Sequence, residues 1–155
     1  VRQLRPRLEQ HFCKENKDRS VFRKNIGRAL LQRAADPFLA DWNLDLTTAA
    51  ARHQHGSRID RVKQAAVECD VTAYVQRRCR FVVIPIEGKL DRLKWESRMV
   101  STVAACDECS PSVGWLGLFA PHRKIRDSGL WQVNELQNQP FTASEYREFE
   151  QIVAS

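Results

Sequence analysis

The sequence has no long hydrophobic run, and we expect no secretion signal. Its longest apolar stretch is FVVIPI (residues 81–86), whereas a helix needs about 20 predominantly apolar residues to cross a bilayer. The first residues, VRQLRPR, contain no apolar segment of the kind that a signal peptide carries. The sequence also contains no low-complexity segment and no internal repeat. We therefore expect a globular cytoplasmic protein with no membrane partner.

The cysteines do not indicate a disulfide framework. There are five, an odd number, and their spacing is irregular, so we expect reduced thiols. Cys106 and Cys109 form the motif CDEC, which supplies half of a zinc site, whereas strong zinc signatures contain two such halves. Cys69, Cys79 and His122 could complete the ligand set, but their spacing is not diagnostic. A structural zinc site is therefore kept as an alternative.

The length and charge narrow the choice of function. A chain of 155 residues fits one domain with a sizeable core, so we expect a single domain over residues 1–155. Lysine and arginine number 25 against 19 acidic residues, which gives a net charge of +6 and a pI near 9.3. This balance favours a polyanionic partner such as nucleic acid, and a basic but otherwise ordinary enzyme is the alternative.

Hydrophobic periodicity and capping residues predict a mostly helical α+β domain. Pro6 suits the first turn of a helix that runs to about Cys13, and Ser20 is a suitable N-cap for the next. The helices that we expect after the first cover residues 20–34, 57–76, 89–105 and 142–154. Residues 38–46 are ambiguous between a short helix and an irregular turn, and residues 47–57 have the composition of a linker or a loosely helical loop. Residues 106–131 have the composition of a long ordered loop.

A strand is predicted where the apolar run FVVIPI is closed by Gly88. Pro85 argues that this strand is not fully central or that its end is irregular. A lone strand cannot satisfy its own backbone groups, so its partners must be weak strands, with residues 132–136 as one candidate, or lie upstream of Val1. The expected fold is a small mixed or antiparallel sheet flanked by helices.

Glu96 is the most informative single residue. It lies three residues after Leu93 and four before Val100, and Val103 continues the same row, so the spacing places Glu96 on the apolar face of its helix. A buried carboxylate requires a cation, which is an arginine, a lysine or a metal. A functional site, a structural salt bridge and a helix rotated enough to expose Glu96 are the three interpretations.

Arg7 and His11 form the second candidate pair. They lie four residues apart, beside an apolar row of Leu4, Leu8 and Phe12, so the first helix presents a cation and an imidazole together at the edge of its buried side. Two ordinary polar residues on a surface helix are the alternative.

Three segments of the chain resemble the GIY-YIG nuclease family, in the same order. LRPRLEQHF (residues 4–12) resembles its first helix, which carries a Leu-x-x-Arg-(hydrophobic)-x-x-His pattern, and RSVFRKNIGRALL (19–31) resembles its second helix in a bacterial and archaeal branch. Residues 95–136, with their WLG and SGLW elements, resemble the segment that carries the acidic residue of the family. The resemblance implies hydrolysis of DNA phosphodiester bonds with a single divalent metal, usually Mg²⁺.

The resemblance also implies roles for individual residues. Arg7 matches an arginine that stabilises charge at the scissile phosphate, and His11 matches a histidine that assists or positions. Glu96 matches the metal-binding glutamate, and Asn134 is our choice for the asparagine near the end of the domain, with Gln132 as the rival. A guanidinium can meet two phosphate oxygens at once, and Mg²⁺ often uses just one or two carboxylates, so the residue types suit this chemistry.

Basic residues on the second helix are the expected DNA contacts. Arg23, Lys24 and Arg28 fall mostly outside the apolar face that we expect for this helix, and we expect them to hold the phosphate backbone. Three further arginines are additional candidates: Arg77, Arg78 and Arg80.

The sequence departs from the family pattern in one respect. Neither GIY nor YIG occurs, and the two tyrosines, Tyr74 and Tyr146, lie in other settings. We therefore expect a member that lacks the N-terminal GIY/YIG hairpin, by truncation or degeneration. The alternatives to a DNA endonuclease are a non-catalytic DNA-binding module and a small zinc-stabilised interaction protein. No heptad pattern or large apolar patch indicates an oligomer, so we assume a monomer.

Overall fold

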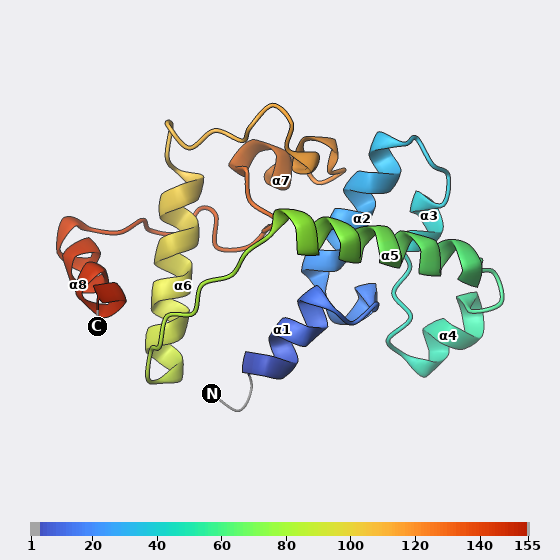
Figure 1. Cartoon of the computed structure of the whole chain (residues 1–155), viewed down its shortest axis with the longest axis horizontal. Coiled ribbons are helices and arrows are strands. Elements are labelled where there is room, and N and C mark those ends of the chain that lie inside the picture. The colour runs from blue at the N-terminus through green and yellow to red at the C-terminus, as the bar shows by residue number, and fades with distance from the viewer. Residues whose placement is uncertain (1–3, 155) are drawn as a thin grey trace. The chain divides into compact units, whose positions relative to one another are not determined.

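The computed structural model describes residues 4–154, and its helices are labelled in Figure 1. The chain divides into two compact units. Unit 1 comprises residues 1–80 and 116–122, and unit 2 comprises residues 81–115 and 123–155.

Unit 1 contains most of the helical elements. They are α1 (Leu4–Phe12), the 3-10 helix η1 (Lys17–Arg19), α2 (Val21–Arg33), α3 (Leu39–Trp42), α4 (Ala49–His55), α5 (Arg61–Arg78) and the 3-10 helix η2 (Leu116–Phe119). Helix α2 is the centre of the unit, because it contacts η1, α3, α5 and η2, and α1 packs against α5.

Helix α2 begins where the sequence predicts. The Ser20 hydroxyl accepts a hydrogen bond from the Arg23 N–H at 3.2 Å, which satisfies one of the free donors of the first turn. Further along, Gly27 lies against the Trp42 indole, and a Cβ at this position would overlap the ring. The indole N–H donates to the Lys24 carbonyl at 3.0 Å, so the close approach of α2 and α3 is fixed by both packing and a hydrogen bond.

Helix α5 begins a little later than predicted. Asp60 is its N-cap and accepts a hydrogen bond from the Lys63 N–H at 2.9 Å, whereas the sequence predicted a helix from residue 57. Val67, Val71 and Val75 recur every fourth residue and form the buried face of the helix. The described core of unit 1 is completed by residues of α2 and α3, including Ile26, Ala29 and Trp42.

Unit 2 contains α6 (Lys89–Ala104), α7 (Arg123–Ser128) and α8 (Ala143–Ala154). An aromatic cluster joins α6 to the α8 segment. The Trp95 ring lies 5.8 Å from the Phe141 ring and 5.5 Å from the Phe149 ring, measured between centroids. Such aromatic contacts carry a large share of the apolar burial of a small unit.

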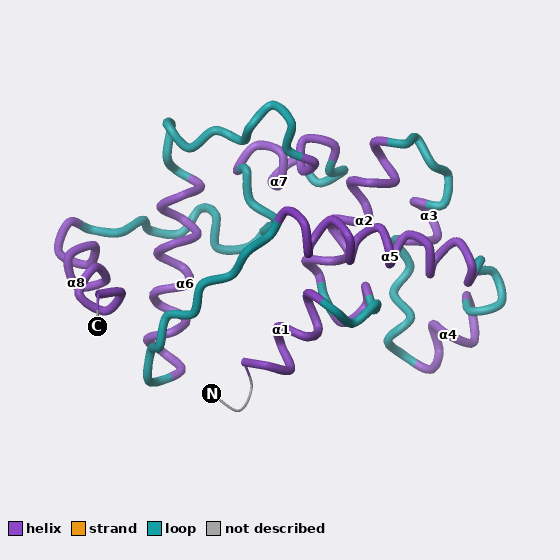
Figure 2. The backbone as a smooth tube through the Cα atoms, in the orientation of Figure 1, coloured by secondary structure: helices purple, strands orange, loops and turns teal. Residues whose placement is uncertain are grey.

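The expected sheet is absent from the described part of the chain, so the predicted α+β class is wrong. Residues 4–154 contain helices and loops and no strand, as Figure 2 shows. Residues 81–86 run as a loop between α5 and α6, and Val82 is 86 % exposed. β-branched residues favour a strand only when a neighbouring strand accepts their backbone hydrogen bonds, and residues 132–136 do not supply one.

Two other segments are more regular than expected. The predicted long loop over residues 106–131 contains η2 and α7. Helix α3 lies within the ambiguous residues 38–46, and α4 lies within residues 47–57. Among the described residues, no helix combines the length and apolar character that a membrane span requires.

Candidate functional site

Helix α1 places Arg7 and His11 on one face, as their spacing predicts. Arg7 is exposed, whereas His11 is half-buried. The His11 Nδ1 atom lies 2.7 Å from the Ser20 hydroxyl oxygen, and the imidazole meets the Phe22 ring edge-on at a centroid distance of 6.0 Å. The imidazole is therefore oriented by a polar and an aromatic contact, both from the start of α2.

The surroundings of His11 favour its neutral form. Burial is the largest cause that lowers its pKa from the usual 6.5, and the positive charges of Arg7 and Arg23 lower it further. At neutral pH the imidazole is uncharged, so one ring nitrogen can accept a proton.

Arg23 is fully buried, so the expectation that it lies outside the buried face of α2 is wrong. Its Nη2 atom lies 2.8 Å from the Glu68 carboxylate and donates to the Thr72 hydroxyl at 2.8 Å. Its Nη1 atom donates to the His11 carbonyl at 3.2 Å. The guanidinium therefore stabilises the backbone of α1 at His11. Because Arg23 is buried and its donors are used within the protein, we do not propose it as a DNA contact.

Lys24 and Arg28 also have partners within unit 1. The Lys24 ammonium lies 3.4 Å from the Asp18 carboxylate, and the Arg28 guanidinium donates to the side-chain oxygens of Asn43 at 2.7 Å and Asn25 at 2.8 Å. Both side chains are only partly exposed, so their role as phosphate contacts stays a prediction.

Three arginines at the end of α5 and just beyond it are exposed: Arg77, Arg78 and Arg80. The sequence offered them as additional phosphate contacts, and their exposure makes them better placed for this role than Arg23.

Glu96 lies on the exposed side of α6, not on its buried side as its spacing suggested. Leu93 is 51 % exposed, whereas Trp95 is 2 % exposed and Ser101 is fully buried. The helix is rotated about its axis because Trp95 packs into the aromatic cluster with Phe141. Of the interpretations that the sequence left open, the rotated helix with an exposed Glu96 is the one that the structure shows.

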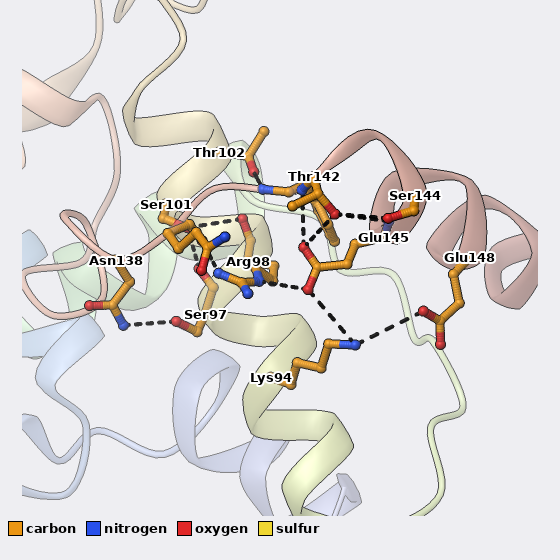
Figure 3. A network of polar contacts seen from close by, with 12 residues as sticks. Lys94, Ser97, Arg98, Ser101, Thr102, Asn138, Thr142, Ser144, Glu145 and Glu148 are labelled. Atoms are coloured by element: carbon orange, nitrogen blue, oxygen red, sulfur yellow. Dashed lines mark hydrogen bonds and ion pairs between the residues drawn. The ribbon is translucent and has the colours of Figure 1, made fainter.

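A polar network joins α6 to the segment before α8 and to α8 itself (Figure 3). The Arg98 guanidinium donates to the Glu145 carboxylate at 3.1 Å and to the Gln139 carbonyl at 2.7 Å. Asn138 donates to the Ser97 hydroxyl at 2.8 Å. The network holds the segment before α8 against α6. It therefore fixes the helix from which Glu96 projects.

Sequence reasoning missed the members of this network and the buried partner of Arg23. Arg98 and Glu145 lie 47 residues apart, and Arg23 and Glu68 lie 45 apart. No local spacing signals such pairs. The one available signal was that Glu68 lies three residues before Val71 and seven before Val75, which places it on the apolar face of the predicted helix.

Asn134 and its rival Gln132 lie in the loop between α7 and α8. Asn134 is exposed and Gln132 is half-buried. The Lys124 ammonium donates to the Val133 carbonyl at 3.4 Å, which ties this loop to α7. The choice between the two amides stays a prediction.

A comparison with family profiles decides the family. The profile of the GIY-YIG domain matches residues 1–155, the whole of the chain. The chain belongs to the GIY-YIG domain family. Neither the comparison with curated proteins nor the one with solved structures returned a match. Membership of this family indicates a nuclease-type function.

GIY-YIG nucleases typically use a divalent metal, and Glu96 suits this requirement. Within residues 4–154 its carboxylate has no ion-pair partner, and it is exposed, so both oxygens are available to a hard cation. Mg²⁺ keeps most of its waters and often takes one or two carboxylates. The exposed carboxylate of Glu96 is therefore of the ligand type that hard divalent cations accept.

No ligand cluster within residues 4–154 supports the alternative of a structural zinc site. The described residues contain no group of three or more His, Cys, Asp or Glu side chains that could hold a metal ion. Structural zinc requires four ligands, and the CDEC motif of this GIY-YIG domain supplies two cysteines.

Proposed function

We propose that this GIY-YIG domain is an endonuclease that hydrolyses DNA phosphodiester bonds with one divalent metal ion. The family match over residues 1–155 carries the proposal. The state of the predicted residues supports it: an exposed arginine, a neutral histidine and an exposed, unpaired carboxylate among the described residues.

We assign to Arg7 the role of stabilising the negative charge that develops at the scissile phosphate. Hydrolysis gathers negative charge on the non-bridging oxygens, and a guanidinium can donate to two of them in parallel. Both Arg5 and Arg7 are exposed, but Arg5 pairs with Glu9 at 3.0 Å, whereas no ion pair joins Arg7 to another residue within 4–154. Arg7 is therefore the α1 arginine that we assign to the phosphate.

His11 is assigned to proton transfer or to positioning of the attacking water. When its Nδ1–H donates to the Ser20 hydroxyl, the Nε2 atom is left as a proton acceptor. Burial keeps this nitrogen unprotonated near neutral pH. The adjacent Phe22 ring limits rotation of the imidazole, so the acceptor points in one direction.

Glu96 is assigned to the metal ion. The ion supplies polarisation of the phosphoryl oxygen and stabilisation of the leaving oxygen. The carboxylate of Glu96 would anchor it through one or both oxygens. Asn134, exposed in the loop before α8, would donate to the phosphate through its amide.

The experiment that tests the assignment compares Arg7→Ala with Arg5→Ala on the same helix. Arg7→Ala should lower the single-turnover cleavage rate of a DNA duplex by about 10²-fold or more, because a lost transition-state donor costs this much. Its DNA affinity should fall only modestly. Arg5→Ala should cleave like the wild type. Equal cleavage by the two variants would overturn the role of Arg7.

A non-catalytic DNA-binding module is the second candidate, because the sequence contains neither GIY nor YIG. In that case the wild type binds DNA in a salt-dependent manner, as expected when arginines displace counterions from phosphates, but does not cleave it. DNA binding that does not weaken as salt is raised would argue against both candidates.

A further inference from the structure

Cys106 and Cys109 are set apart from the other cysteines by their geometry. They are the first and last residues of a four-residue turn directly after α6, in which the Cys109 N–H donates to the Cys106 carbonyl at 3.3 Å. A turn of this kind keeps its end Cα atoms within about 7 Å, and a disulfide spans Cα separations of about 4.4–6.8 Å. The turn therefore keeps the two Cα atoms at or near the separations that a disulfide spans.

The two thiols also interact with each other. The Cys109 thiol and the backbone N–H groups of Glu108 and Cys109 donate hydrogen bonds to the Cys106 sulfur. These bonds lower the pKa of Cys106, although burial and the charge of Glu108 partly oppose them. The same thiol–thiol hydrogen bond is the largest cause that raises the pKa of Cys109. The Cys106 thiol therefore has the lower pKa of the two and loses its proton more readily than the Cys109 thiol.

We propose that Cys106 and Cys109 form a redox-active dithiol that exchanges with low-molecular-weight disulfides. Cys106 is the attacking residue and Cys109 is the resolving residue. The proposal does not depend on the nuclease assignment, because it uses no residue of that site.

The exchange takes place in two steps. The Cys106 thiolate attacks one sulfur of the small disulfide, its S–S bond breaks, and the leaving thiolate takes a proton from water. Cys109 then loses its proton, and its sulfur attacks Cys106 in the mixed disulfide. The second small thiolate leaves and is protonated in turn. The protein pair is oxidised by two electrons, and the small disulfide is reduced to two thiols.

The other three cysteines provide internal controls. Cys13 and Cys69 are exposed but lie on different elements of unit 1, and no other cysteine is near either of them in sequence. Burial raises the pKa of Cys79, which makes its thiol less reactive. Differences in reactivity between Cys106 and Cys69 therefore report on the turn and not on exposure alone, since Cys69 is the more exposed of the two.

The test uses the reduced full chain and oxidised glutathione, with peptide mapping by mass spectrometry. The wild type should form a Cys106–Cys109 disulfide, and Cys109→Ser should accumulate glutathione on Cys106. In the wild type, limited alkylation at neutral pH should label Cys106 at least about threefold faster than Cys69, since each unit of lowered pKa raises the thiolate fraction more than it reduces nucleophilicity.

Three results would overturn the proposal. They are failure of the Cys106–Cys109 disulfide to form, formation of disulfides only between molecules, and equal labelling of Cys106 and Cys69. The alkylation measurement uses the wild type, so it decides the question even if a serine variant does not fold. Cys69→Ser is the matched variant and should leave oxidation of the pair unchanged.

Discussion

The two units are stabilised in different ways. In unit 1, Arg23 and Glu68 form an ion pair at 2.8 Å whose side chains are 0 % and 3 % exposed. In unit 2, Arg98 and Glu145 form a pair at 3.1 Å whose side chains are 19 % and 15 % exposed. The first pair belongs to a core of valines, isoleucine and tryptophan, whereas the second lies beside an aromatic cluster nearer the surface.

The difference bears on how each unit supports its predicted site residues. Unit 1 fixes both the backbone and the side chain of His11, because the buried Arg23 donates to the His11 carbonyl and Ser20 contacts the imidazole. Unit 2 fixes only one side of α6, through Arg98 and Trp95, and leaves Glu96 exposed. These two surroundings suit different tasks. The contacts of His11 orient a proton acceptor, whereas the exposed carboxylate of Glu96 can bind a hydrated metal ion.

Removal of the buried arginine should have the largest effect on stability. Arg23→Ala leaves the Glu68 carboxylate buried without its cation, and such a loss costs about 3–5 kcal/mol in the free energy of unfolding. Urea denaturation should show this loss, and hydrogen exchange should locate it in unit 1. Arg33→Ala, at an exposed position on the same helix, should change stability by less than about 0.5 kcal/mol. Similar losses in the two variants would contradict the account of unit 1.

Filling the glycine contact in unit 1 should have the next largest effect. Gly27→Ala places a Cβ against the Trp42 ring, and overpacking of this kind costs about 1–3 kcal/mol. Gly114→Ala is the control in unit 2, since a Cβ there meets no atom within 4 Å. Thermal unfolding should show a loss for Gly27→Ala alone. A tolerated alanine at position 27 would mean that α2 and α3 do not pack as closely as described.

Breaking the pair in unit 2 should cost less than breaking the pair in unit 1. Arg98→Ala removes hydrogen bonds to Glu145 and to the Gln139 carbonyl, and the partly exposed groups can bind water instead. We expect a loss of about 1 kcal/mol. Arg147→Ala, at an exposed position on α8, is the control. Hydrogen exchange in residues 138–154 should report the loss, and an effect as large as that of Arg23→Ala would remove the distinction between the units.

The smallest expected effect is a pH dependence that comes from His11. Burial and the charges of Arg7 and Arg23 lower its pKa from 6.5 in the folded state, so the unfolded state binds the proton more readily. The contribution of His11 to stability is therefore fully present above pH 6.5 and is lost as the pH falls through 6.5 toward the lowered folded-state pKa.

Urea denaturation across this range checks the prediction. His11→Gln should reduce the fall in stability below pH 6.5, whereas His53→Gln, at an exposed position on α4, should leave it unchanged. A pH profile that is identical in the wild type and His11→Gln would refute the burial of the imidazole.

The sequence predicts local features of this chain well. Ser20 caps α2 as expected, and the helices predicted over residues 89–105 and 142–154 correspond to α6 (Lys89–Ala104) and α8 (Ala143–Ala154). Capping and periodicity depend on residues within one or two turns, so the sequence contains the information directly.

Features that depend on distant residues could not be predicted. Leu93, Val100 and Val103 have the spacing of a buried face, but Trp95 buries more surface against Phe141, and the helix turns accordingly. The run FVVIPI has strand composition, yet a strand also needs a partner, and none lies within residues 4–154. The burial of Arg23 similarly depends on Glu68, which lies on another helix.

The most direct test of the central claim is plasmid nicking by the full chain with Mg²⁺, with EDTA, and beside Glu96→Gln. The amide keeps the shape of the side chain but removes its charge, and at an exposed position it should leave the fold intact. The account predicts nicking that requires Mg²⁺ and falls by about 10²-fold or more in Glu96→Gln. Nicking by Glu96→Gln at the wild-type rate, or no nicking by a wild type that binds the plasmid, would contradict it.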